Sequence, residues 1–238
     1  MRHEQQVLLI DADDTLWETN LKFERTVASF CELVRPLGYP DDHVRRQVDT
    51  AERANIARRG YGARSFLLTL EEVYLGLAGH RALDSHLEEI RRFARLLVEE
   101  PPRLYDGVPE TLAYLAPRHR LFYFSKGDAA EQARKLALSG LERFFAAHEI
   151  VPEKNEAAYR ALVARHALPP ADTWMVGNSP RSDINPALAA GLNAVYIPSQ
   201  HNWEYENEEI RPGPFIPSGV EGGRLLVLKN FRDLQEHF

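Results

Sequence analysis

Residues 7–16 read VLLIDADDTL, so four apolar residues run directly into a segment that contains three aspartates. An apolar run that ends in charge is typical of a buried parallel strand ending at the carboxyl edge of an α/β sheet, where such sheets hold their ligands. Three carboxylates this close repel one another, so the folded chain must supply a cation or hydrogen-bond donors. An acidic turn after a strand is the simpler interpretation, since Asp is a common turn residue.

The composition limits the classes of protein to consider. With 238 residues, 44% hydrophobic and 27% charged, the chain is expected to form one large globular domain or a core with a subdomain. A net charge of -6 gives no electrostatic reason to expect a nucleic acid or a membrane surface as partner. Cys31 is the single cysteine, which excludes an internal disulfide. We expect it to be a small buried apolar residue.

No stretch of the sequence is long and apolar enough for a signal peptide or a membrane span. We therefore expect a cytoplasmic protein. The sequence leaves the oligomeric state open, and a monomer is among the states that it allows.

Helical periodicity replaces the strand pattern between residues 17 and 100. Apolar residues recur every three or four positions, as at Phe23, Val27, Phe30 and Val34. Breaks at residues 36–40, at 60–62 and near 79 predict about four helices. A parallel crossover needs only about a dozen residues, so this insertion predicts a subdomain of its own. We expect residues 17–100 to form a helical cap, and residues 1–16 with 101–238 to form the core.

Strand and helix patterns alternate again after residue 105. The strand candidates are 121–124, 148–151, 173–176, 194–197 and 225–228, and helical patterns cover 129–138 and 156–166. This alternation predicts an α/β fold with a doubly wound, mainly parallel sheet. Residues 198–223, rich in Pro, Gly and acids, predict a long surface excursion whose His201 and Trp203 either reach the cleft or pack the loop.

Polar groups follow each of the first four strands. Residues 125–128, SKGD, offer a hydroxyl and free backbone N–H groups at the start of a helix, an anion-binding arrangement. Lys154 follows the third strand, and Asn178 and Asp183 follow the fourth. Each alone has an ordinary structural interpretation, as a helix N-cap, a surface lysine or a helix start. Four successive strands with polar groups at one edge favour a functional site.

With these four motifs in order and a helical insertion after the first, the chain resembles the haloacid dehalogenase-like hydrolase superfamily. The resemblance covers the chain except residues 198–223. It implies a Rossmann-like core and covalent catalysis through an aspartyl intermediate on Asp11, with Asp13 as general acid/base. It further implies that Ser125 and Lys154 hold the transferring group and that Asp183 helps to bind magnesium.

The residue types suit phosphoryl transfer on chemical grounds. A carboxylate that attacks a phosphate monoester approaches an anion, so the site needs a hard cation and a lysine. Mg²⁺ prefers oxygen ligands, and the expected metal-site residues are Asp11, Asp13, Asp183 and Asn178. Asn178 stands where the family more often has Asp, which removes one negative charge. We therefore expect weak Mg²⁺ binding.

The residues that contact the substrate are less well marked. We expect Thr15, Trp17, Lys126 and Gly127 to do so, with Asn20 near the cleft. Lys126 stands where the family often has Asn, and it either adds positive charge near the phosphate or points to solvent. Residues 58–64, RRGYGAR, are a candidate mobile turn of the cap. A cap that closes favours a small phosphorylated metabolite as substrate.

These features predict an Mg²⁺-dependent phosphatase that hydrolyses small-molecule phosphate monoesters. A phosphoryl transferase or mutase shares the same residues and stays an alternative. A 2-haloacid dehalogenase is disfavoured by Asp13, because a halide needs no proton to leave. Asn178 suggests a non-catalytic binding or regulatory protein as a further alternative. The presence together of the five residues that the resemblance makes functional disfavours it, namely Asp11, Asp13, Ser125, Lys154 and Asp183. A receiver domain would be a shorter chain without a cap.

Overall fold

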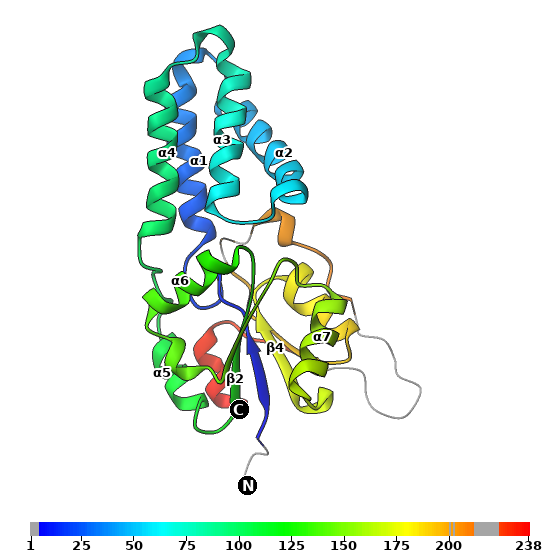
Figure 1. Cartoon of the computed structure of the whole chain (residues 1–238). Helices are drawn as coiled ribbons and strands as arrows, with labels where there is room; N and C mark the ends of the chain where they lie inside the picture. The colour runs from blue at the N-terminus through cyan, green and yellow to red at the C-terminus, as the bar shows by residue number, and fades with distance from the viewer. Residues whose placement is uncertain (1–4, 200, 202, 212–223) are drawn as a thin grey trace. The chain divides into compact units, whose positions relative to one another are not determined.

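The computed structural model describes residues 5–199, 201, 203–211 and 224–238. The chain divides into two compact units, one containing the chain up to Asn20 and again from Pro102, the other spanning Leu21–Pro101. Figure 1 shows the path of the chain through both units. The sequence places the first boundary after residue 16, but the structure keeps residues 17–20 in the first unit. The carboxylate of Asp14 accepts hydrogen bonds from the backbone N–H groups of Thr19 and Asn20, which holds this segment to the end of the first strand.

The first unit is built on a six-stranded sheet in which every neighbouring pair is parallel. The strands are β1 (Val7–Ile10), β2 (Arg120–Lys126), β3 (Ala147–Val151), β4 (Thr173–Gly177), β5 (Asn193–Tyr196) and β6 (Leu225–Val227), in the order β3-β2-β1-β4-β5-β6. Because β1 lies between β2 and β4, the residues that follow these three strands reach the same edge. The predicted α/β, doubly wound sheet is confirmed.

Helices cover both faces of this sheet. They are α5 (Val108–Leu115), α6 (Ala129–Ser139), α7 (Glu156–His166) and α8 (Asn185–Ala189), with short helical turns at η3 (Glu142–Phe144), η4 (Pro170–Asp172), η5 (Pro180–Ile184), η6 (Glu204–Glu206) and η7 (Phe231–Glu236). Leu8 and Ile10 pack in one apolar core with α5, α6 and η7. Leu9 packs in a second core with α7 and α8. Adjacent strand residues point to opposite faces, so one short strand contributes to both cores.

The second unit contains four α-helices. They are α1 (Asn20–Val34), α2 (Asp41–Arg59), α3 (Ala63–Ala78) and α4 (Asp84–Glu99), with the short turns η1 (Arg35–Leu37) and η2 (Gly79–Arg81). Their apolar faces form a separate core around Phe30, Phe66 and Leu70, and Cys31 is buried in it. The breaks fall where the sequence places them, because Pro36 and the glycines at 60, 62 and 79 interrupt regular helix.

Part of the predicted excursion lies outside the described residues, namely 200, 202 and 212–223, as does the N-terminal segment 1–4. The described part contains η6, which returns to the polar edge of the sheet. Within the residues that the structure describes, no helix is long and apolar enough to cross a membrane.

Candidate active site

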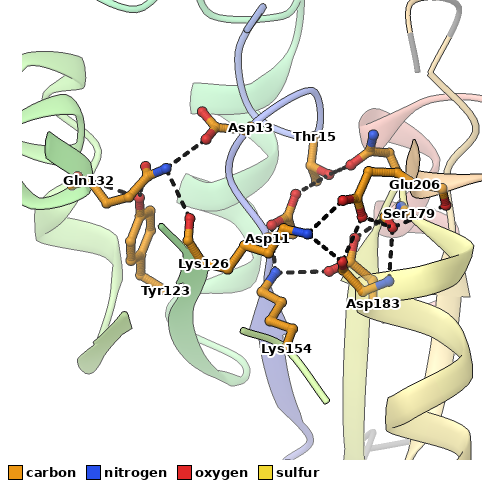
Figure 2. Close-up of polar contacts among 12 residues, drawn as sticks. Asp11, Asp13, Thr15, Tyr123, Lys126, Gln132, Lys154, Ser179, Asp183 and Glu206 are labelled. Carbon is orange, nitrogen blue, oxygen red and sulfur yellow. Dashed lines mark hydrogen bonds and ion pairs between the residues drawn. The ribbon is translucent and has the colours of Figure 1, made fainter. Parts of the chain in front are cut away.

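A buried ion pair lies at the carboxyl end of β1. The Nζ atom of Lys154 lies 2.5 Å from Asp11 Oδ1 and 2.8 Å from Asp183 Oδ1, and all three residues are less than 10% exposed. Figure 2 shows the lysine between the two carboxylates. Burial, followed by repulsion from Asp183, raises the pKa of Asp11 to about 7, and Lys154 acts against both effects. Burial alone would lower the pKa of Lys154, but the two aspartates raise it. One ammonium therefore balances two carboxylates.

Local geometry explains why Asp183 reaches this point. It lies in the single π-helical turn η5, which begins after Ser179, and the backbone N–H of Ser179 donates to Asp183 Oδ2 at 3.0 Å. A Cβ atom on Gly177 would lie 2.2 Å from the same oxygen. Only glycine at position 177 therefore lets the carboxylate lie against the end of β4. The hydroxyl of Tyr159 donates to the carbonyl groups of Ser182 and Asp183, which fixes the turn from the other side.

Thr15 acts on Asp11 from within the protein. Its Oγ1 lies 2.9 Å from Asp11 Oδ2 and 3.1 Å from Asn178 Oδ1, and its side chain is buried. The hydroxyl thus links the first and fourth motifs. Thr15 contacts Asp11 Oδ2, whereas Lys154 contacts Oδ1. This position suits a residue that orients Asp11 better than the substrate-binding residue that the sequence suggests.

The carboxylate of Asp13 faces α6, away from the Lys154 ion pair. It accepts hydrogen bonds from Gln132 Nε2 at 2.7 Å, Thr19 Oγ1 at 2.6 Å and Trp17 Nε1 at 2.9 Å, and Lys135 Nζ lies 3.2 Å away. Figure 2 shows its contact with Gln132. Burial alone would raise the pKa of Asp13, but Lys135 and these hydrogen bonds outweigh it and hold the pKa at about 2. Asp13 is therefore ionised in this arrangement.

Trp17 does not offer a surface to a substrate. Its side chain is 0% exposed and stacks with Tyr123 at a ring distance of 6.3 Å. The expectation that Trp17 binds substrate is corrected on this ground, because its one polar atom is used to hold Asp13. The neighbouring Asn20 donates from Nδ2 to the carbonyl group of His201, and Trp203 packs against Tyr205.

The end of β2 and the residues after it differ in part from the expected anion cradle. Ser125 lies near the end of β2, and its side chain is buried. The N–H of Gly127 donates to the carbonyl group of Val151, so this predicted free N–H is already used. Lys126 neither faces open solvent nor points at Asp11. Its Nζ lies 2.7 Å from Ser182 Oγ and 2.6 Å from Glu206 Oε1.

The site offers oxygen donors for a hard cation. Those that the contacts bring together are the carboxylates of Asp11 and Asp183 and the amide oxygen of Asn178. This donor set suits Mg²⁺ and offers no sulfur or imidazole that would favour zinc. Across the described residues, no group of three or more His, Cys, Asp or Glu side chains converges as a metal cluster. A cation here would therefore complete its coordination with backbone, amide or water oxygens.

Several residues of this region are missing from the sequence prediction, among them Gln132, Lys135, Tyr159 and Glu206. Gln132 and Lys135 are three positions apart on α6 and so lie on one helix face, which is a weak signal for joint action. Tyr159 lies in the predicted helix 156–166 but reads as a core aromatic residue. Glu206 lies in the irregular excursion and carries no signal in the sequence.

Comparisons with known proteins identify the family to which the chain belongs. The family model of the haloacid dehalogenase-like hydrolases matches residues 5–191. None of the curated proteins compared with the chain matches it. A haloacid dehalogenase-like hydrolase from Xanthomonas campestris is 27% identical, with a TM-score of 0.82, and the match covers 98% of this chain and 90% of that one.

Two more distant structures share the fold and are named for different activities. L-2-haloacid dehalogenase from Xanthobacter autotrophicus, with chloropropionic acid covalently bound, is 16% identical with a TM-score of 0.61, covering 98% of this chain and 97% of that one. A predicted phosphoglycolate phosphatase from Haemophilus somnus is 17% identical with a TM-score of 0.62, covering 99% and 98%. At these identities the likeness concerns the fold alone. Since the family model spans most of the chain, this protein belongs to the haloacid dehalogenase-like hydrolase family.

Proposed function

We propose that this hydrolase is an Mg²⁺-dependent phosphatase of small-molecule phosphate monoesters, with Asp11 as nucleophile. The observation that carries the proposal is the position of Lys154 between Asp11 and Asp183. A phosphate group that reaches Asp11 meets an ammonium group at the same point, which offsets the repulsion between two anions.

In the first step, an Asp11 carboxylate oxygen attacks phosphorus and the bond from phosphorus to the alcohol oxygen breaks. The leaving oxygen takes a proton from Asp13, which releases the alcohol and leaves an aspartyl phosphate. In the second step, water attacks this phosphorus, Asp13 takes the proton, and the bond to Asp11 breaks. Inorganic phosphate leaves and both carboxylates return to their starting state.

Asp13 as described here is in the form that accepts a proton. Its oxygens are held by Gln132, Thr19 and Trp17, which are all hydrogen-bond donors. To act in the first step, its carboxylate must first take up a proton from solvent and must exchange at least one of these donors for the leaving oxygen of the substrate. The donors on α6 are therefore part of the proposal, since they hold Asp13 between the two steps.

Asp11, Asp183, Asn178 and the carbonyl group of Asp13 would hold the magnesium ion. When bound, the ion supplies positive charge that offsets the charge of the phosphate oxygens. Lys154 supplies the same kind of charge from the protein. Ser125, buried near the end of β2, is proposed to donate to a phosphate oxygen. The four-helix unit of residues 21–101 is proposed to act as a cap and to set the choice of a small phosphorylated metabolite.

A phosphoryl transferase or mutase would use the same residues and keep water from the aspartyl phosphate. Carbon–halogen cleavage is less well supported. A halide leaves without a proton, so it would give no task to Asp13 or to the donors that surround it.

The test is inorganic phosphate release from an aryl phosphate, with Mg²⁺ and with EDTA, for the parent protein and for Asp11→Asn. Metal-dependent release that the substitution abolishes supports the proposal. Thr50→Ser, which alters an exposed hydroxyl on α2, serves as the control and should leave the rate unchanged. Release that survives Asp11→Asn would refute Asp11 as the nucleophile. A parent protein that consumes the aryl phosphate only when an acceptor alcohol is added, and forms the phosphate ester of that alcohol instead of inorganic phosphate, would identify a transferase.

A further inference from the structure

Glu206 is a buried carboxylate supplied by the excursion after β5. It is 7% exposed, whereas the neighbouring Glu204 and Glu209 are exposed. Its Oε2 accepts hydrogen bonds from Ser179 Oγ and Ser182 Oγ, each at 2.6 Å. Its Oε1 lies 2.6 Å from Lys126 Nζ. Of the four glutamates in residues 204–209, only Glu206 is buried.

A buried ion pair usually adds little to the free energy of unfolding. The side chains of Lys126 and Glu206 are only 15% and 10% exposed, so both charges lose most of their water. The attraction between such charges often does no more than offset this cost, and apolar residues would fill the same space as well. The arrangement is therefore better explained by where it places other groups than by stability.

The two serines belong to the turn that carries Asp183. Ser179 Oγ accepts from the backbone N–H of Ser182 at 2.9 Å, and the N–H of Ser179 donates to Asp183 Oδ2. Asp183 Oδ1 in turn meets Lys154. A chain of short polar contacts thus runs from Glu206 through the turn to the ion pair at Asp11.

Lys126 is on the opposite side of the nucleophile strand. It ends β2, whereas the serines follow β4, and β1 lies between these two strands. Glu206 therefore joins the end of β2 to the turn after β4, on either side of β1, the strand that Asp11 follows. Figure 2 shows Lys126 extending past Asp11 toward Glu206. We name the contacts of Glu206 with Lys126, Ser179 and Ser182 the Glu206 clamp.

We propose that Glu206 is a positioning residue of this active site: through the Glu206 clamp it fixes the turn that carries Asp183 and the end of β2, which carries Ser125 and Lys126. This inference rests on the proposed function. It assigns a role to the excursion, which lies beyond the residues matched by the family model. Glu206 acts through other residues and does not contact the reacting atoms.

The test compares Glu206→Gln with Glu208→Gln. Glu208 lies two residues away in the same segment, and its nearest ion-pair partners are more distant, at 3.6 and 3.7 Å. Three quantities are measured: hydrogen exchange of a peptide that covers residues 178–184, kcat and KM for an aryl phosphate at saturating Mg²⁺, and the Kd of Mg²⁺ by calorimetry. Lys126→Met breaks the same clamp from its other end and provides a second variant.

The clamp predicts faster exchange at residues 178–184 in Glu206→Gln and a kcat about 10- to 100-fold lower, as small displacements of catalytic groups cause. KM should change by less than about threefold, because the phosphate-binding groups remain present. Glu208→Gln should match the parent in all three quantities. In the double variant with Lys126→Met, the losses in kcat should not add, since both substitutions break one unit.

Each other outcome overturns the inference. Faster exchange with an unchanged kcat would leave Glu206 a structural residue only. Unchanged hydrogen exchange at residues 178–184 in Glu206→Gln would show that Glu206 does not hold this turn in place. A parent protein without phosphate release would refute the proposed function separately. In that case the Kd of Mg²⁺ tests the clamp, since Asp183 is the group that Glu206 positions. A Kd raised about threefold or more in Glu206→Gln but not in Glu208→Gln would support the inference, and equal values would contradict it.

Discussion

Lys154 donates a hydrogen bond from Nζ to Asp11 Oδ1 at 2.5 Å, and the two side chains are almost completely buried. The same ammonium is 2.8 Å from Asp183, which is also buried. Its removal would leave two carboxylates together in a poorly hydrated place. Breaking a buried ion pair from one side costs about 3–5 kcal/mol, because the remaining charge has no partner.

We therefore predict that Lys154→Met lowers the free energy of unfolding by about 3–5 kcal/mol at pH 7 in EDTA, measured by urea denaturation. The matched control is the double variant Lys154→Met/Asp183→Asn, which removes one of the two stranded carboxylates. It should be more stable than the single variant. A double variant less stable than Lys154→Met would contradict the electrostatic explanation.

Asp13 gives a prediction about leaving groups. If Asp13 protonates the leaving oxygen, Asp13→Asn should slow the hydrolysis of an alkyl phosphate by about 10²–10⁴-fold. An aryl phosphate, whose leaving phenol is far more acidic, needs less help and should lose much less. The measurement is kcat/KM for both substrates in the parent and the variant. Equal losses for both substrates would mean that the substitution damages the site in another way.

Much of this site follows from one rule about sheets. The strand patterns at 7–10, 148–151 and 173–176 predict the strands that precede Asp11, Lys154 and Asp183, and the parallel arrangement brings the residues after them to one edge. Asp11 and Asp183 meet Lys154 for this reason. The bounds predicted for one helix, 156–166, agree with α7, because the side chain of Asn155 accepts from the backbone N–H of Ala158 and so caps its first turn.

The sequence could not predict which face each helix turns toward the site, or where an irregular segment comes back to the sheet. The pattern of α6 does not say which of its polar residues face Asp13, so Gln132 and Lys135 stayed unassigned. Trp17 follows the first motif closely and was expected near the substrate, but its large apolar ring is better placed in the core. Glu206 lies in a segment without periodicity, where four glutamates look alike.

Asn178 gives a prediction about the metal. Its amide oxygen lies 3.1 Å from Thr15 Oγ1, at the same hydroxyl that contacts Asp11. Asn178→Asp would add a carboxylate beside the oxygen donors, and we predict that it lowers the Mg²⁺ concentration for half-maximal rate about tenfold, the effect of about 1.4 kcal/mol in metal binding. The measurement is the rate of phosphate release as a function of Mg²⁺ concentration.

The same substitution should have the opposite effect without metal. Three carboxylates near one ammonium repel one another, so Asn178→Asp should lower the Tm in EDTA and recover it on addition of Mg²⁺. Asn185→Asp, at a more exposed amide at the start of α8, is the control for an added charge. A Tm of Asn178→Asp that does not respond to Mg²⁺ would show that the ion binds elsewhere.

Glu52 on α2 makes the stability of the helical unit depend on pH. Burial, followed by repulsion from Asp49 and Glu24, raises the pKa of Glu52 from 4.5 to about 7. Below pH 4.5 the group is protonated in both the folded and the unfolded chain and has no effect. Between pH 4.5 and 7 the unfolded chain loses this proton and the folded chain keeps it, so this group makes unfolding steadily more favourable; above pH 7 the penalty is complete.

We therefore predict that Glu52→Gln, which cannot ionise, raises the free energy of unfolding relative to the parent by about 1–3 kcal/mol at pH 8 and has little effect at pH 4.5. Urea denaturation at pH 4.5, 6 and 8 measures the difference, and it should grow across this range. Profiles of parent and variant that run parallel from pH 4.5 to 8 would contradict the prediction, because they would mean that Glu52 ionises equally readily in the folded and the unfolded chain.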